Sequence, residues 1–175
     1  MNNYNDIICN PLNDRNKRFL LGKKGVNEMM AIGLNPSTAS EKKLDPTSRN
    51  IQKIARNNDC DGWWLVNLYP IRTSKPNNLP VKPNLMLTKK NLEFISNLLK
   101  NPQFKITKVL CCWGNHIENH LYLKQQALKI LEFIREKNLN VYCIGKTKSG
   151  NPFHPSPLSV NNHLGGINGL VILQY

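Results

Sequence analysis

Long apolar runs are absent from this sequence. About 18 consecutive apolar residues are needed to cross a bilayer, and no segment of the chain approaches that length. The first residues, Met1–Asn5, are polar, whereas a secretory signal has an apolar centre. We therefore expect a cytoplasmic protein that does not enter a membrane.

The sequence also lacks repeats, low-complexity tracts and any change in composition that would separate two domains. Its hydrophobic content of 40% is too high for a disordered chain. A chain of 175 residues is long enough to bury a sizeable core. We expect one domain over residues 1–175, without an obligatory protein partner.

The five cysteines contain no CxxC pair, and three of them, Cys111, Cys112 and Cys143, lie in apolar strand-like segments where cysteine acts as a small hydrophobe. His116 and His120 are four residues apart, but no carboxylate or cysteine pattern accompanies them. We interpret these two histidines as solvent-facing helix residues. The sequence therefore predicts no disulfide, no iron–sulfur cluster, no bound metal and no cofactor.

Acidic residues are scarce. Eleven Asp and Glu stand against 24 Lys and Arg, which gives a formal net charge of +13. An excess of this size favours a polyanionic partner, and we expect DNA, single- or double-stranded. Because the basic residues are spread along the chain, we expect a charged face on a folded body. The alternative is a coding bias toward lysine, since the chain is also rich in asparagine.

Short apolar segments alternate with stretches of helical periodicity. Asp45 and Pro46 predict the start of a helix that runs to Asn57, and Thr88 predicts the start of a second helix. The expected inner faces of the second and third helices contain Leu92, Ile95, Leu98 and Leu99, and Leu121, Leu128, Leu131 and Ile134. Strands are expected at 28–33, 63–68, 108–113 and 141–145, with an edge strand at 170–173 and one further strand in the basic segment 1–28.

This alternation predicts an α/β protein: a three-layer α/β/α sandwich around a central, mainly parallel, four-stranded sheet. Asn35, Asn67, the pair Trp113-Gly114 and the segment containing His154 all follow the ends of expected strands. Ligands bind at the carboxyl ends of strands in open α/β sheets. We therefore expect these segments to meet at one edge of the sheet.

Two of these segments are stiffened by proline: Gly33-Leu34-Asn35-Pro36-Ser37 and His154-Pro155-Ser156-Pro157-Leu158-Ser159. The second resembles a signature loop of the uracil-DNA glycosylase superfamily. The first is similar to the GINPG loop of the mismatch-specific branch, and the chain also resembles a small glycosylase-related family of bacteria and phages. The resemblance covers about residues 29–159. It implies the three-layer fold and a cofactor-free enzyme that excises a base flipped out of DNA.

The resemblance implies two catalytic residues. Asn35 would position the attacking water by accepting a hydrogen bond from it, although an Asn-Pro pair is also a common turn. His154 would donate a hydrogen bond to the departing base, where negative charge accumulates in the transition state. The alternative for His154 is a surface histidine without a catalytic role.

The base-binding residues that the resemblance implies are Leu34, Ser37, Asn67 and Tyr69. Asn67 offers a donor and an acceptor to a pyrimidine edge, and Tyr69 could stack on the base. Ser37 stands where uracil-specific enzymes have a tyrosine that blocks the C5 position. Because serine is shorter than tyrosine, the pocket should have room beside the C5 position of the base. We therefore expect a substrate with a C5 substituent, including thymine or a modified cytosine. We interpret Trp64 and Trp113 as core residues.

The expected DNA contacts are Pro155, Ser156, Leu158, Ser159, Lys148 and Arg72. Among them Leu158 is the expected wedge into the base stack, and the two serines would contact phosphate. Lys148 could alternatively attack the sugar as an amine, but phosphate contact is the simpler role. Asp45 is expected to cap a helix, with activation of the water as its alternative role.

Together these features predict a monofunctional DNA glycosylase, a hydrolase that leaves an abasic site in base excision repair or in defence against phages. The alternative is a non-catalytic protein on the same fold that binds nucleic acid or a nucleotide, since a fold does not guarantee activity. An enzyme acting on RNA or on free nucleotides would use the same cavity.

Overall fold

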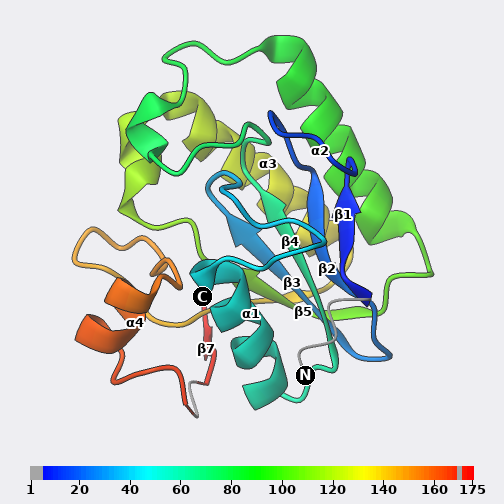
Figure 1. Cartoon of the computed structure of the whole chain (residues 1–175), viewed down its shortest axis with the longest axis vertical. Coiled ribbons are helices and arrows are strands. Elements are labelled where there is room, and N and C mark those ends of the chain that lie inside the picture. Colours follow the sequence, from blue (N-terminus) through cyan, green and yellow to red (C-terminus); the bar gives the residue numbers. More distant parts are fainter. Residues whose placement is uncertain (1–5, 169–170) are drawn as a thin grey trace.

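The expected parallel strands form the centre of a larger sheet in the computed structural model, which describes residues 6–168 and 171–175 (Figure 1). Seven strands lie in the order β1-β2-β4-β3-β5-β6-β7. The strands are β1 (Ile8–Asn10), β2 (Leu20–Lys23), β3 (Glu28–Gly33), β4 (Gly62–Asn67), β5 (Ile106–Cys111), β6 (Asn140–Cys143) and β7 (Leu173–Gln174). The helices are α1 (Pro46–Asn57), α2 (Leu85–Lys100), α3 (Leu121–Glu136) and α4 (Pro157–His163), with short 3₁₀ turns η2 (Pro76–Asn78) and η3 (Asn115–Asn119).

The α/β class is confirmed, but the prediction of a four-stranded sheet is wrong. Four strands, β4, β3, β5 and β6, do run parallel. The hairpin β1–β2 and the strand β7 extend the sheet with antiparallel pairs at its two edges. The segment 1–28 was expected to contain one strand, and its described part, residues 6–28, contains two complete strands and the first residue of β3. These edge strands are only two to four residues long, too short for a recognisable alternation.

The central strands β3 and β4 are buried along their whole length. Alternate residues of β3 enter different cores, because successive side chains of a strand point to opposite faces. Met29 and Ala31 pack with α1, whereas Met30 and Ile32 pack with α2 and α3. The helices α1 and α3 accordingly lie on opposite sides of the sheet (Figure 1). This double burial explains why the strands appear in the sequence as continuous apolar segments.

The helices differ from the expectation at two points. The second helix begins at an N-cap formed by Asn84, which accepts a hydrogen bond from the Leu87 amide, and Thr88 lies inside the helix. On α3, Leu121 and Leu128 are 71% and 63% exposed. The predicted inner face is therefore rotated by part of a helical turn from the face that is buried. The buried face of α3 consists of Tyr122, Leu123, Gln126, Ala127, Ile130 and Ile134.

Two parts of the sequence interpretation fall on residues outside those described. They are the polar start Met1–Asn5 and Leu170, the first residue of the expected edge strand. No helix among the described residues is long and apolar enough to cross a membrane.

Candidate functional site

The loops at the carboxyl edge of the parallel strands enclose a cavity of about 290 Å³, here called the central cavity. The chain leaves β3 toward β4 on one side and leaves β5 toward β6 on the other, so the adjacent strands β3 and β5 form the topological switch point of the sheet. Open α/β sheets bind ligands at such a point. The polar residues that line the central cavity include Arg18, Asn35, Ser37, Asp45, Asn67 and His154. The two expected catalytic side chains therefore line one cavity.

Asn35 is held by its amide nitrogen. Its Nδ2 donates to the carbonyl oxygens of Pro36, at 2.9 Å, and Thr73, at 2.8 Å. The Thr73 amide in turn donates to the Pro36 carbonyl, which fastens the loop after β4 to the loop after β3. No hydrogen bond to Asn35 Oδ1 is present among the described residues, so this oxygen is the part of the amide that can accept a bond from a ligand or water.

His154 reaches the central cavity because Gly114 gives it room. Gly114 has a φ of 72°, and a Cβ at this position would lie 3.1 Å from the Cβ of His154. The Gly114 amide donates to the Pro152 carbonyl, which brings the loop after β6 over the end of β5. A larger residue at position 114 would therefore be strained and would also displace His154.

The imidazole of His154 is neutral near pH 7. Burial lowers the pKa of His154 to about 4; the Asp45 carboxylate opposes this shift and His116 adds to it. A neutral imidazole donates one hydrogen bond and carries no net charge. It can stabilise a negative charge that forms in the cavity without requiring a buried cation beforehand.

This pKa gives stability a measurable pH dependence. The unfolded chain binds a proton at His154 below its ordinary pKa of about 6.5, while the folded protein resists protonation until about pH 4. Stability from this residue is therefore lost as pH falls through this window, by about 2 kcal/mol between pH 7 and pH 5. Urea unfolding at both pH values should show that His154→Gln removes this part of the loss. If wild type and His154→Gln lost the same stability between pH 7 and pH 5, the loss could not be assigned to His154.

Asn67, at the end of β4, is oriented by a buried arginine. Arg18 Nη2 donates to Asn67 Oδ1 at 3.3 Å, and Arg18 Nη1 donates to the Ala39 carbonyl at 3.1 Å. This bond uses one lone pair of Oδ1 and fixes the orientation of the amide, and no bond from Asn67 Nδ2 is present among the described residues, so its hydrogens are left for a ligand. Gly33 leaves space for this amide, since a Cβ there would lie 2.8 Å from Asn67 Nδ2.

Arg18 itself is 1% exposed and has no ion pair with a carboxylate among the described residues. Burial lowers its pKa to about 10, with Arg72 acting in the same direction and Asp45 opposing it, so the guanidinium remains charged at neutral pH. Its Nε is buried without a partner in the described structure. The site thus contains a fixed positive charge beneath Asn67.

Asp45 is the helix cap that the sequence predicts. Its Oδ1 accepts from the Ser48 amide at 2.8 Å and from the Ser48 hydroxyl at 2.7 Å. Asp45 also lines the central cavity, as the one carboxylate among its described lining residues. The capping role is confirmed, and the carboxylate is also placed to act on a ligand.

Two expected base-binding residues lie elsewhere. Tyr69 is buried in the core beside α2 and α3, where its hydroxyl accepts from the Asn84 amide and its ring packs edge-on against Tyr122. Leu34 is buried in the same core. Tyr69 lines neither this cavity nor the one beside it, so we withdraw its assignment to base binding. Leu34 does not line the central cavity but lines an adjoining cavity that also contains Asn35 and His154. Trp64 and Trp113 are core residues, as the sequence indicates.

Arg72 is committed to the protein itself. Its Nε donates to the Asp14 carbonyl, and its Nη1 donates to the carbonyls of Ser37 and Ala39. These bonds join three loops, which makes Arg72 a structural clamp. Its expected role as a DNA contact has no support from this geometry.

The loop after His154 is built for rigidity. Pro155 is buried, and its carbonyl accepts from Asn50 Nδ2 on α1. Ser156 caps α4 by accepting from the Ser159 amide, and the two hydroxyls are hydrogen bonded. Pro155 therefore serves packing, and Ser156 and Ser159 serve the cap.

Leu158 differs from its neighbours. It is 71% exposed on the first turn of α4, although leucine is usually buried. It lines a cavity of about 420 Å³ that also contains Asn35 and His154 and therefore adjoins the central cavity. Lys148 is exposed on the loop between β6 and α4. These two residues remain available to a partner.

No group of three or more His, Cys, Asp and Glu side chains that could hold a metal occurs in residues 6–168 and 171–175. Cys112 lines the cavity, but burial raises the pKa of its thiol to about 12. The prediction for His120 is wrong, because this residue ends η3 with its ring against Tyr122 and its Nε2 buried.

Arg18 is the principal site residue that sequence reasoning missed. It belongs to a run of basic residues, Arg15, Lys17 and Arg18, and charge alone predicts exposure for all three. The available signal is the apolar segment Phe19-Leu20-Leu21 that follows directly, since it places Arg18 next to a buried strand. Thr38 and Thr73, which also line the cavity, carry no comparable signal.

No curated protein matches this sequence. Residues 18–156 match the model of a family described as "Protein of unknown function (DUF1643)". This match begins at Arg18 and ends just after His154, so it contains nearly all of the central cavity. Because the match covers well over half of the sequence, the chain belongs to the DUF1643 family.

Proposed function

We propose that this protein is a DNA glycosylase that hydrolyses the bond between a flipped pyrimidine and its deoxyribose. The observation that carries the proposal is the convergence of Asn35 and His154 on one cavity, from loops almost 120 residues apart in the sequence. These are the same two loops that resemble the signature loops of uracil-DNA glycosylases. The net charge of +13 favours the polyanionic substrate.

The proposed reaction needs little from the protein beyond positioning and charge stabilisation. The bond between C1′ and the ring nitrogen breaks, and its electron pair leaves with the base. His154, as a neutral donor, stabilises the negative charge at the base carbonyl. Asn35 Oδ1 holds the water whose oxygen bonds to C1′. Asp45 takes the proton of this water and releases it to solvent, and the released base anion takes up a proton from solvent, so that the carboxylate is restored.

The remaining residues are assigned to recognition. Asn67 donates from Nδ2 to an acceptor on the pyrimidine edge, because the bond from Arg18 to its oxygen fixes the orientation of the amide. Leu158 enters the space that the flipped base leaves, and Lys148 contacts phosphate. Ser37 and Thr38 line the cavity with short side chains, which leave room beside the C5 position of the base. The proposed substrates therefore include pyrimidines with a substituent at C5.

The proposal is tested by incubating the purified protein with oligonucleotides that contain uracil, thymine or a C5-substituted cytosine, followed by alkali, which breaks the strand at abasic sites. We expect cleavage with at least one base, and its loss in Asn35→Ala. Tight binding of the same oligonucleotides without cleavage would overturn the proposal and support the non-catalytic binding protein.

Asp45→Asn separates the two roles of this residue. Asparagine caps helices about as well as aspartate, so we expect an unchanged unfolding midpoint. The lost carboxylate can no longer accept a proton, and general-base catalysis is worth about 100- to 10,000-fold. Single-turnover excision should therefore slow by at least about 100-fold. Full activity in Asp45→Asn would restrict Asp45 to capping.

A further inference from the structure

A second cavity, here called the side chamber, adjoins the central cavity. It has a volume of about 540 Å³, within the range of about 300–1,000 Å³ of small-molecule sites. Ser37, Thr38, Thr73 and Ser74 line both cavities. The boundary between the two is therefore a ridge of four short hydroxyl side chains from the loops after β3 and β4.

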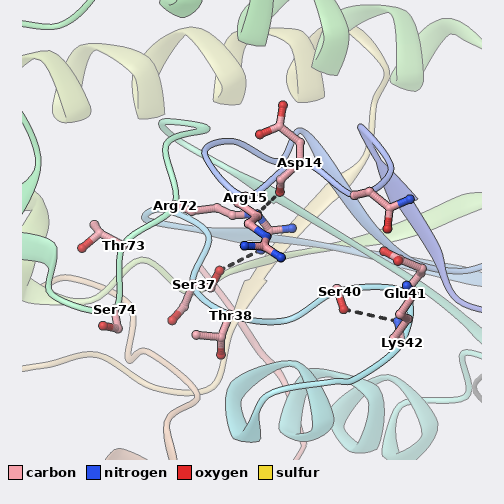
Figure 2. Close-up of a pocket in the computed structure, with 11 residues that line it drawn as sticks. Asp14, Arg15, Ser37, Thr38, Ser40, Glu41, Lys42, Arg72, Thr73 and Ser74 are labelled. Carbon is pink, nitrogen blue, oxygen red and sulfur yellow. Dashed lines mark hydrogen bonds between the residues drawn. The ribbon is translucent and has the colours of Figure 1, made fainter.

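The walls of the side chamber are joined by hydrogen bonds from the Arg72 side chain to backbone carbonyls. Figure 2 shows Arg72 between the loop that contains Asp14 and the loop that contains Ser37. Its guanidinium donates to the Asp14 carbonyl at 3.0 Å and to the Ser37 carbonyl at 2.7 Å. These bonds fix the walls before any ligand arrives, which lowers the cost of ordering a site on binding.

The lining of the side chamber is polar at every described position. Its residues are Asn13, Asp14, Arg15, Ser37, Thr38, Ser40, Glu41, Lys42, Arg72, Thr73 and Ser74. An apolar ligand would leave these groups without partners, which costs free energy. A lining of hydroxyl groups, amides and charges of both signs instead suits a ligand with several hydrogen-bond donors and acceptors.

The charged groups of the side chamber have both signs, which favours a ligand that can donate and accept hydrogen bonds. Hydrogen bonds from the Lys17 side chain and from backbone amides lower the pKa of Asp14 to about 2, so this group is ionised. Glu41 Oε2 is buried and accepts no hydrogen bond from the described residues. The same lining contains the cations Arg15, Lys42 and Arg72. A hydroxyl group can donate to a carboxylate and accept from a cation, whereas a phosphate dianion can only accept.

We propose that the side chamber binds a hydroxyl-rich substituent, such as a sugar attached through a hydroxymethyl group, carried at C5 of the pyrimidine in the central cavity. This inference rests on the proposed function, because the ring must occupy the central cavity for its substituent to cross the ridge. The ridge side chains are short enough to let the linking atoms pass, and the hydroxyl groups of the sugar meet the polar lining.

The test compares two oligonucleotides that differ only in the sugar: one contains 5-hydroxymethylcytosine and the other its glucosylated form, with uracil as a reference. The measured quantity is the ratio of kcat/KM for the glucosylated base to that for the hydroxymethyl base. A few new hydrogen bonds, each contributing about 0.5–1.5 kcal/mol, predict a ratio of at least about ten. Ser37→Tyr, which blocks the ridge, and Glu41→Ala, which removes the orphan acceptor, should each lower this ratio about tenfold. Gln125→Tyr, on the exposed side of α3, should leave it unchanged.

The outcomes separate this inference from the proposed function. Excision of uracil with a ratio of one or less overturns the inference and leaves the glycosylase in place. A high ratio that neither variant lowers also overturns it, because the sugar is then recognised elsewhere. The absence of excision from every oligonucleotide overturns both.

Discussion

Replacing His154 by alanine is expected to lower the rate of base excision by about 100- to 1,000-fold, the usual cost of removing one donor from a site where negative charge develops. The variant loses the hydrogen bond to the departing base and adds water to the cavity. The measurement is single-turnover excision of the best base at pH 7. The affinity for DNA should change little, because His154 would act mainly in the transition state.

The glutamine variant and the pH profile refine this prediction. His154→Gln restores a neutral donor and should recover part of the lost rate. The wild-type rate should not rise as pH falls from 7 to 5, since the pKa of His154 is about 4 and the neutral ring is the active form. A rate that increases with the ordinary titration of histidine would mean that the imidazolium acts instead. Unchanged excision in His154→Ala would remove His154 from the mechanism.

Glu28→Ala is expected to destabilise the fold by about 3 kcal/mol or more, because each hydrogen-bond donor left without a partner costs about 1–3 kcal/mol. Glu28 is fully buried at the start of β3. Its carboxylate accepts from the Trp64 indole at 2.8 Å, the Lys105 amide at 2.7 Å and the Gly25 amide at 3.0 Å. Alanine leaves all three donors without a partner.

Urea unfolding checks this value against Glu132→Ala, which removes an exposed glutamate from α3. Surface changes of this kind usually alter stability by about 0.5 kcal/mol or less. Glu28 lies at the opposite end of the sheet from the central cavity, so the folded fraction of Glu28→Ala should retain its excision rate. A loss below about 1 kcal/mol would show that the network is not stabilising.

The centre of the fold was predictable because double burial leaves a clear trace in the sequence. The strand 28–33 was placed at its observed bounds, and the other three parallel strands within a few residues. The helix after Asp45 was also placed correctly, since a capping side chain and Pro46 mark its start. The edge strands were missed or underestimated because pairs such as Ile8 with Gly22 depend on tertiary contacts and not on local periodicity.

Site residues could be predicted where they directly follow the end of a strand. They could not be predicted where the role of the side chain depends on whether it is buried in the folded protein. Asn35, Asn67 and His154 were found because the topology brings strand ends to one edge. Tyr69 also follows a strand end, but its side chain points to the core beneath the loop. Arg18 and Arg72 appeared to be surface charges, whereas backbone carbonyls from other loops hold their guanidinium groups.

The most direct test of the central claim is mass spectrometry of a single reaction that quantifies both the free base and the abasic sites in the DNA. We predict equal amounts of the two with the wild-type protein, and neither with His154→Ala at matched DNA binding. Intact DNA bound in the central cavity, with no free base released from any pyrimidine tested, would contradict the account.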